Sequence, residues 1–327
     1  MQIKHIIQFL DRFAPPVYQE SYDNAGLITG NSEQNCSAAL LTLDVTEAVI
    51  DEAISKNCNL IIAHHPIIFK GMKKINGSNQ VERCVIKAIK NDIAIFASHT
   101  NLDAMKNGVN FKIAEKIGLQ AVSVLAPKPQ TLSKLVTFVP IENTPAVLQA
   151  LHAAGAGNIG NYSECSFEVT GTGSFKPNAE ANPFIGKAGE LEKVPENRLE
   201  LIFPSYLKNA LLSALRSAHP YEEVAYYISN VENENQEVGS GAIGKLPEAI
   251  PTIDFMLYLK QKMNVNVIRH TALVKEKVQN IAVCGGTGSF LLSHAIRKKA
   301  DVFISADFKY HEFFNAENQI IIADIGH

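Results

Sequence analysis

The sequence predicts an α/β protein whose largely parallel α/β core is split by an inserted α+β domain. Short apolar runs that end in polar clusters recur along the chain, as in "NLIIAHHP" and "IIIADIGH". Amphipathic stretches such as "TEAVIDEAISKN" separate these runs, and such an alternation of strand and helix favours a parallel sheet. The middle of the chain is instead rich in glycine and turn residues, which indicates a second kind of fold there.

The predicted core strands are, in order, "ALLTLDVT", "NLIIAHHP", "AIFASHTNLDA", "NIAVCGGTGS", "DVFISADF" and "IIIADIGH". The helices expected between them are "TEAVIDEAISKN", "QVERCVIKAIKN", "NGVNFKIAEKIG" and "FLLSHAIRKKA". In a parallel sheet, functional side chains gather at the carboxyl ends of the strands. The polar residues at these ends are Asp44, His64 with His65, His99 with Asp103, Asp307, and Asp324 with His327.

The inserted domain is predicted to cover residues 127–242. Its strands are expected at "KLVTFVPIE", "CSFEVTGTGSF", "NRLELIFP" and "AYYISNV", with one helix around "SYLKNALLSALRSA". Residues 1–126 and 243–327 would then fold together. Two sequential domains are the alternative, but the last strands would then form a very small sheet of their own.

Composition excludes several classes of protein. A net charge of −3 and the absence of a run of basic residues argue against a nucleic-acid partner. No apolar stretch approaches the roughly 20 residues of a membrane helix, and Asp11 and Arg12 interrupt the N-terminal apolar run too early for a signal peptide. The five cysteines are scattered and form no CxxC pair, so we expect a cytoplasmic protein.

Two adjacent imidazoles, His64 and His65, end a predicted buried strand. Neighbours within a strand point to opposite faces, but Pro66 disfavours continuation of the strand and lets the two rings splay apart. Splayed imidazoles suit two metal ions better than one. The alternative is that one ring is packed or at the surface, while the other binds a backbone group.

Two further strands end in potential ligands. In "SHTNLDA", the carboxylate of Asp103 can bridge two cations, although Asn101 or Asp103 can equally cap the following helix. In "IIIADIGH", a glycine permits a turn before His327, which as a terminal residue is often merely at the surface. Together these nitrogen and oxygen donors suit Zn, Mn, Fe, Co or Ni.

Two other stretches have both a structural and a functional interpretation. "VCGGTGSF" is expected to be a tight strand-to-helix turn, although such a turn can also hold an anion. "AHPYEEVAYYI" places His219, Glu222 and Glu223 beside tyrosines. We expect a structural role for this stretch, with cation or ligand binding as the alternative.

The stretches "YDNAGLITG", "IIAHHPIIFKGMKKI", "ASHTNLDAMKNGVN", "SADFKYHEF" and "IADIGH" resemble the Nif-three-like dinuclear metal centre family, also called GTP cyclohydrolase I type 2 homologues. The insert, with "GNIGNYSECSF", "GTGSFKPNAEANPFIG" and "AHPYEEVAYYI", is similar to that of longer members, whose extra domain resembles the PII and CutA proteins. The resemblance covers essentially the whole chain.

The resemblance implies a toroidal homohexamer with two divalent metal ions per subunit. The positions that match metal ligands are His64, His65, Asp103 and His327, and Asp103 matches the bridging carboxylate. In the family, a liganding glutamate follows four residues after the last histidine, and this sequence ends before that position. We interpret this as a truncation, which would weaken or abolish binding of the second metal.

The function that we expect is metal-dependent hydrolysis of a nucleotide, and the resemblance suggests opening of the imidazole ring of GTP. His99 is the candidate for shuttling protons, and His311 and Asp44 are weaker candidates for supporting the site. A phosphatase or phosphodiesterase would use the same metals. The alternative of another class is a non-catalytic metal-binding or regulatory hexamer whose insert senses a ligand. The metal and the substrate stay open.

Overall fold

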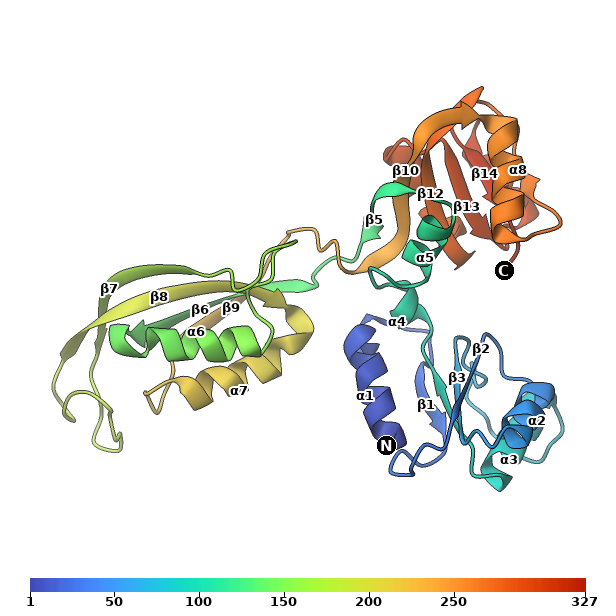
Figure 1. Ribbon diagram of the computed structural model, residues 1–327. Coiled ribbons are helices and arrows are strands. Elements are labelled where there is room, and N and C mark those ends of the chain that lie inside the picture. Colours follow the sequence, from blue (N-terminus) through green and yellow to red (C-terminus); the bar gives the residue numbers. More distant parts are fainter. The chain divides into compact units, whose positions relative to one another are not determined.

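The computed structural model describes residues 1–327, and the chain divides into two compact units. The first unit combines Met1–Pro127 with Glu237–His327, and the second is Lys128–Gln236 (Figure 1). Our predicted boundary at 242 differs from this division because strand β10 (Gly239–Pro251) pairs with β5 (Gln120–Pro127) and with β12 (Lys277–Thr287) of the first unit.

The first sheet of the first unit has the strand order β1-β4-β3-β2. Strands β2, β3 and β4 are parallel, and β1 is antiparallel to β4. Helix α1 covers one face of this sheet, and α2 and α3 cover the other (Figure 1). The bounds are α1 Ile3–Phe13, β1 Gly26–Thr29, β2 Ala39–Thr42, α2 Glu47–Ser55, β3 Leu60–Ala63, α3 Gln80–Lys90 and β4 Ala94–Ala97.

The second sheet of this unit has the order β11-β14-β13-β12-β10-β5. Strands β12, β13 and β14 are parallel, while β5, β10 and β11 pair antiparallel with their neighbours. Helices α5 and α8 pack on one face, and α9 packs on the other. The remaining bounds are α4 Thr100–Asp103, α5 Val109–Lys116, α8 Thr252–Met263, β11 Arg269–His270, α9 Leu292–Arg297, β13 Val302–Ala306 and β14 Ile321–Asp324.

The second unit is one antiparallel sheet of order β7-β8-β6-β9 with two helices. Its bounds are β6 Leu132–Pro140, α6 Thr144–Ala153, β7 Phe167–Phe175, β8 Glu192–Pro204, α7 Lys208–Ala218 and β9 Tyr226–Asn230. Alternate strand residues such as Leu135 and Leu199 form the core with α6 and α7, so both helices lie on one face of the sheet. Short 3-10 turns are η1 Pro16–Tyr18, η2 Ile141–Asn143, η3 Ser205–Leu207, η4 Ser289–Leu291 and η5 Tyr310–Ala316.

The predicted α/β class is confirmed, and the six predicted core strands are the six parallel strands. The core contains two sheets, where we expected one. Each triplet of parallel strands is flanked by an antiparallel strand, β1 in one sheet and β11 in the other, which the apolar runs do not indicate. No helix is both long and apolar enough to span a membrane.

Candidate metal centre

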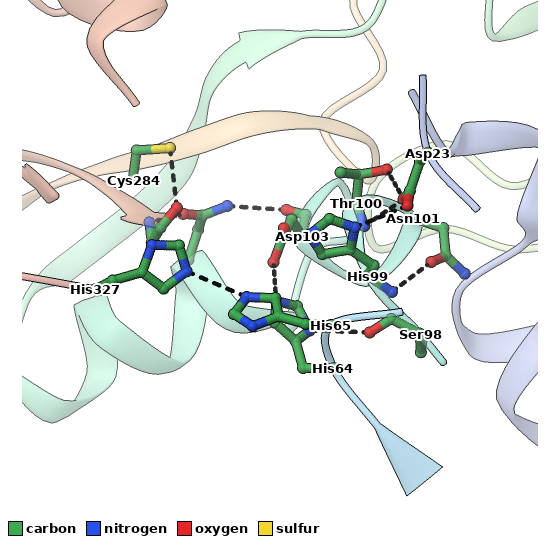
Figure 2. Close-up of polar contacts among 12 residues, drawn as sticks. Asp23, His64, His65, Ser98, His99, Thr100, Asn101, Asp103, Cys284 and His327 are labelled. Carbon is green, nitrogen blue, oxygen red and sulfur yellow. Dashed lines mark hydrogen bonds and ion pairs between the residues drawn. The ribbon is translucent and has the colours of Figure 1, made fainter. Parts of the chain in front are cut away.

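The polar ends of three parallel strands meet at one cavity of about 940 Å³ in the first unit (Figure 2). His64 and His65 follow β3, and His99 follows β4 directly before α4. Asp103 is the last residue of α4, and His327 follows β14. All five predicted site residues therefore line one cavity, although they are far apart in the sequence.

The two adjacent imidazoles reach the same cavity because β3 ends at Ala63, directly before them. Their rings lie 5.0 Å apart at an angle of 47°. Their backbone amides still donate to carbonyls at the end of the neighbouring strand β2, from His64 to Thr42 and from His65 to Leu43. The end of the strand is thus held firmly while both side chains turn toward the cavity.

Each of the four imidazoles in the cavity is held at Nδ1 by an oxygen acceptor, and Figure 2 shows two of these contacts, His64 with Ser98 and His99 with Asp23. A carbonyl or carboxylate oxygen accepts the hydrogen bond, so Nδ1 is the donor, and in the neutral ring this arrangement leaves the lone pair of Nε2 available to a metal ion. The pairs are His64 with the Ser98 carbonyl (2.9 Å), His65 with Asp44 (2.8 Å), His99 with Asp23 (2.8 Å) and His327 with Asp307 (2.6 Å).

The free Nε2 atoms converge. His327 Nε2 lies 3.1 Å from His65 Nε2, and one nitrogen from each of His64, His65 and His99 falls within 4.8 Å of the others. This short contact brings two potential ligand atoms from distant parts of the sequence together. A cation between these donors would be ligated by both, so the donor set fits a transition metal.

Asp103 supplies the carboxylate, with Oδ1 3.6 Å from His64 Nε2. Burial raises the pKa of Asp103 to about 7 and lowers the pKa of His64 to about 4. The alternative role in capping is not used, because the next helix, α5, has no side-chain cap. His64 is thus neutral at pH 7, as a ligand must be, and Asp103 is a partly buried group whose ionised form a nearby cation would stabilise.

A model of the Duf34/NIF3 (NGG1p interacting factor 3) family matches residues 1–327. The chain belongs to this family. A relative from Bacillus subtilis (strain 168), named "GTP cyclohydrolase 1 type 2 homolog", is 44% identical over 309 residues, which are 94% of this chain and 83% of the relative. A relative of the same name from Halalkalibacterium halodurans is 42% identical over 98% of this chain and 87% of its own length.

Solved structures agree with this assignment to the NIF3 family. The crystal structure of a Bacillus cereus protein related to NIF3 matches with a TM-score of 0.88 and 40% identity, over 100% of this chain and 88% of that one. The Staphylococcus aureus protein SA1388 matches with a TM-score of 0.78 and 29% identity, over 100% and 87%.

Sequence reasoning missed Asp23, and it placed Asp307 at a strand end without predicting that Asp307 holds His327. The Asp23 side chain is fully buried, and its second oxygen accepts hydrogen bonds from the backbone and the hydroxyl of Thr100. Burial alone would raise the pKa of Asp23, but the hydrogen bonds from His99 and Thr100 outweigh it and lower the pKa. The stretch "YDNAG" contains Asp23, but nothing in that stretch indicates its partner 76 residues later.

Of the two weaker candidates, Asp44 lies at the site and His311 does not. Asp44 holds His65, as described above. His311 is exposed in η5, where its ring lies 5.2 Å from that of Tyr310, and it does not line the cavity. Asp324 is also turned away, because it pairs with Arg269 and accepts the backbone amide of Phe308 at 3.0 Å.

The glycines of "VCGGTGSF" shape the cavity wall beside His327. Gly286 has a φ of +65°, and a Cβ atom there would lie 3.1 Å from Cε1 of His327. Cys284 lines the same wall, but burial raises its pKa to about 12, so its thiol is protonated at neutral pH. The absence of a side chain at Gly286 therefore leaves the space that the His327 ring occupies.

Proposed function

We propose that this NIF3-family protein is a dinuclear metal-dependent hydrolase that acts on a nucleotide. The observation that carries the proposal is the set of four imidazoles, each held at Nδ1 by an oxygen acceptor, around one carboxylate. Two metal ions in such a site would lower the pKa of water and clamp the oxygens of a substrate. The proposed metal ligands are His64, His65, Asp103 and His327.

The number of donors supports catalysis more than a purely structural metal site. Structural sites are closed by protein ligands, whereas catalytic sites keep an open position. Three histidines and one carboxylate cannot complete the coordination of two ions, so positions are left for water and substrate. A carboxylate has two oxygens, which is why we assign the bridging position to Asp103.

His99 is the proposed proton shuttle. Asp23 holds its Nδ1 at 2.8 Å and so directs Nε2 into the cavity, where an imidazole can accept and return a proton. A buried aspartate beside a histidine also stabilises the imidazolium form that such a shuttle passes through. A ring nitrogen of His99 also lies within 4.8 Å of ring nitrogens of His64 and His65, so metal ligation is the alternative role of His99.

The size and lining of the cavity support a nucleotide as substrate. A volume of about 940 Å³ lies at the upper end of ordinary ligand pockets. The rings of Tyr22, Phe69 and Phe290 line it and offer flat apolar surfaces for a base. The name shared by the relatives supports GTP, with water opening the imidazole ring, while a phosphate ester of a nucleotide is the other substrate class for the same site.

The experiment is to measure metal content and turnover on the same samples. Protein purified without chelator is loaded in turn with Zn, Mn, Fe, Co and Ni, and is then assayed with GTP and a nucleotide panel. We expect about one to two metals per chain, and turnover that Asp103→Asn abolishes. Asp92→Asn, an exposed position with φ +54° that both residues tolerate, is the matched control. Fewer than one metal per chain would refute the site.

The substitution His99→Gln distinguishes a proton shuttle from a metal ligand at this position. A shuttle predicts a normal metal content, a reduced kcat and a changed pH profile. Loss of one metal equivalent would instead make His99 a ligand.

The second candidate is a non-catalytic, metal-binding regulatory assembly. The observation that favours it is a second cavity within Lys128–Gln236, which shares no residue with the metal centre. Two metals per chain without turnover on any substrate would support this candidate over the hydrolase.

We also propose that the chain assembles into a toroidal homohexamer. The family resemblance supports this, and so do large exposed apolar side chains of the first unit, among them Phe9, Leu41 and Phe290, which are 64–76% exposed in the single chain. Sedimentation velocity of the purified protein tests the proposal, and a monomer at micromolar concentration would refute it.

A further inference from the structure

The second unit contains a cavity of about 590 Å³ on the sheet face that α6 and α7 leave uncovered. Phe138, Glu196 and Tyr227 line it, and each alternates with a neighbour that packs under the helices. The segment after β7, which includes Pro183 and Phe184, closes one side. Its volume is that of an ordinary small-molecule site.

A buried carboxylate lies at the base of this cavity. Glu196 is 7% exposed, and its Oε1 accepts a hydrogen bond from the Tyr221 hydroxyl at 2.8 Å. No protein group donates to Oε2, which lies against Gly173, where a Cβ atom would be only 1.9 Å away. The carboxylate thus has one oxygen free for a ligand, in a position that only a glycine at 173 permits.

The stretch "AHPYEEVAYYI" holds this carboxylate in place. His219 is buried, and burial lowers its pKa. Its Nε2 donates to the Phe138 carbonyl at 2.9 Å, and its Nδ1 accepts the amide of Tyr221 at 3.1 Å. His219 therefore fixes the backbone of Tyr221, whose hydroxyl in turn fixes Glu196. The structural role expected for this stretch serves a binding site.

Aromatic rings surround the carboxylate. Tyr221 lies 5.8 Å from Phe175 and 6.3 Å from Phe184, and Phe138 lies 6.0 Å from Tyr227, measured between ring centroids. The faces of such rings attract cations, most strongly where water is excluded.

The charged residues that line the cavity also favour a cationic ligand. Glu222 and Glu223 accompany Glu196, and the Oε1 of Glu222 also accepts the amide of Asn182 at 2.8 Å, which tethers the closing segment. The cationic residues of the lining are Lys176 and Arg198, and Arg198 is already paired with Glu200 at 2.7 Å. A buried carboxylate left without a positive partner is costly, and an anionic ligand would raise that cost.

We propose that this cavity binds a small organic cation, an amine or amidinium group carried on an apolar or aromatic body. The charged group binds Oε2 of Glu196, and the body lies among the rings of Phe175, Phe184 and Tyr221. This site is separate from the metal centre, so the inference is independent of the proposed hydrolase.

The test is calorimetric titration of the full chain with pairs of matched probes. Benzamidine is compared with neutral benzamide, and phenethylamine with 2-phenylethanol. We expect each cation to bind about tenfold tighter than its neutral partner or more. Glu196→Gln should abolish this preference while keeping the shape of the side chain. Glu168→Gln, which removes the same charge from β7 outside the lining, should keep it.

Gly173→Ala provides a second variant that keeps every charge. Its methyl group displaces the Glu196 carboxylate, so we expect loss of the preference for cations. The melting temperature of the first unit should stay unchanged. Equal binding of cation and neutral probe, persistence of the preference in Glu196→Gln, or no binding of either cation at millimolar concentration would each overturn the proposal.

Discussion

At the scale of single residues, the metal centre depends on which nitrogen of each imidazole carries the proton. Three carboxylates, Asp23, Asp44 and Asp307, and one backbone carbonyl set this for the four rings. None of the three was predicted as a ligand, because a ligand set is indicated by histidines at strand ends, whereas an Nδ1 acceptor can come from any loop. The sequence thus indicated which histidines would share a cavity and named Asp44 as a support, but it did not indicate the support that Asp23 gives to His99.

Asp307→Asn should weaken metal binding without removing a ligand. An amide in this position can donate to His327 Nδ1, which places the ring proton on Nε2 and removes the lone pair that faces His65. Supports of this kind are worth about 10–100-fold in metal affinity. Competition with a chromophoric chelator measures the loss, and Asp92→Asn is the control. Unchanged affinity would show that Asp307 does not set the tautomer.

Asp103→Asn should stabilise the metal-free protein at pH 8, although it damages the metal site. The folded-state pKa of about 7 lies above the ordinary value of 3.8, so the wild type loses stability as the pH rises through about 7. The neutral amide has no such loss, and we expect a gain of ~2 kcal/mol at pH 8 that shrinks toward pH 5.

Urea unfolding of chelator-treated protein at both pH values measures this difference. His64, whose folded-state pKa of about 4 lies below the ordinary 6.5, loses its contribution as the pH falls. That loss is common to both proteins and cancels in the comparison. A variant less stable than wild type at pH 8 would contradict the raised pKa of Asp103 on which this prediction rests.

At the scale of elements, the strands that the sequence indicated were those with unbroken apolar runs. Strand β3 is buried along nearly its whole length and was found, whereas β10 carries glycines and a lysine that break its pattern, and β11 has only two residues. Antiparallel strands of this kind are defined by partners far along the chain, such as β5 for β10. The six parallel strands alone suffice to bring the predicted ligands together.

Gly286→Ala should disturb the metal centre through the backbone of the segment after β12. The position has φ +65°, which is strained for alanine, and the new methyl group would press on His327 at 3.1 Å. We expect a loss of ~1 kcal/mol in stability and a lower metal affinity. Gly71→Ala, where a Cβ atom meets nothing within 4 Å, is the matched control. Equal metal affinity in both variants would show that Gly286 does not position His327.

At the scale of the whole molecule, the chain carries two units with separate hydrophobic cores and separate cavities. The sequence suggested an insert through its change of composition, but the insert's cavity depends on contacts between Glu196, Gly173 and Tyr221 that no spacing rule indicates. The candidate metal centre and the cavity of the second unit share no residue. The two sites are therefore separable by experiment.

Calorimetric melting should therefore show two transitions that respond to different ligands. Binding to the folded state stabilises the unit that binds, by about 2.7 kcal/mol at a hundredfold excess over the Kd. We expect metal to raise the transition of Met1–Pro127 with Glu237–His327, and benzamidine to raise that of Lys128–Gln236. Asp103→Asn should abolish only the first shift, and Glu196→Gln only the second. A single transition that both ligands raise, and that either substitution affects, would mean that the units unfold together.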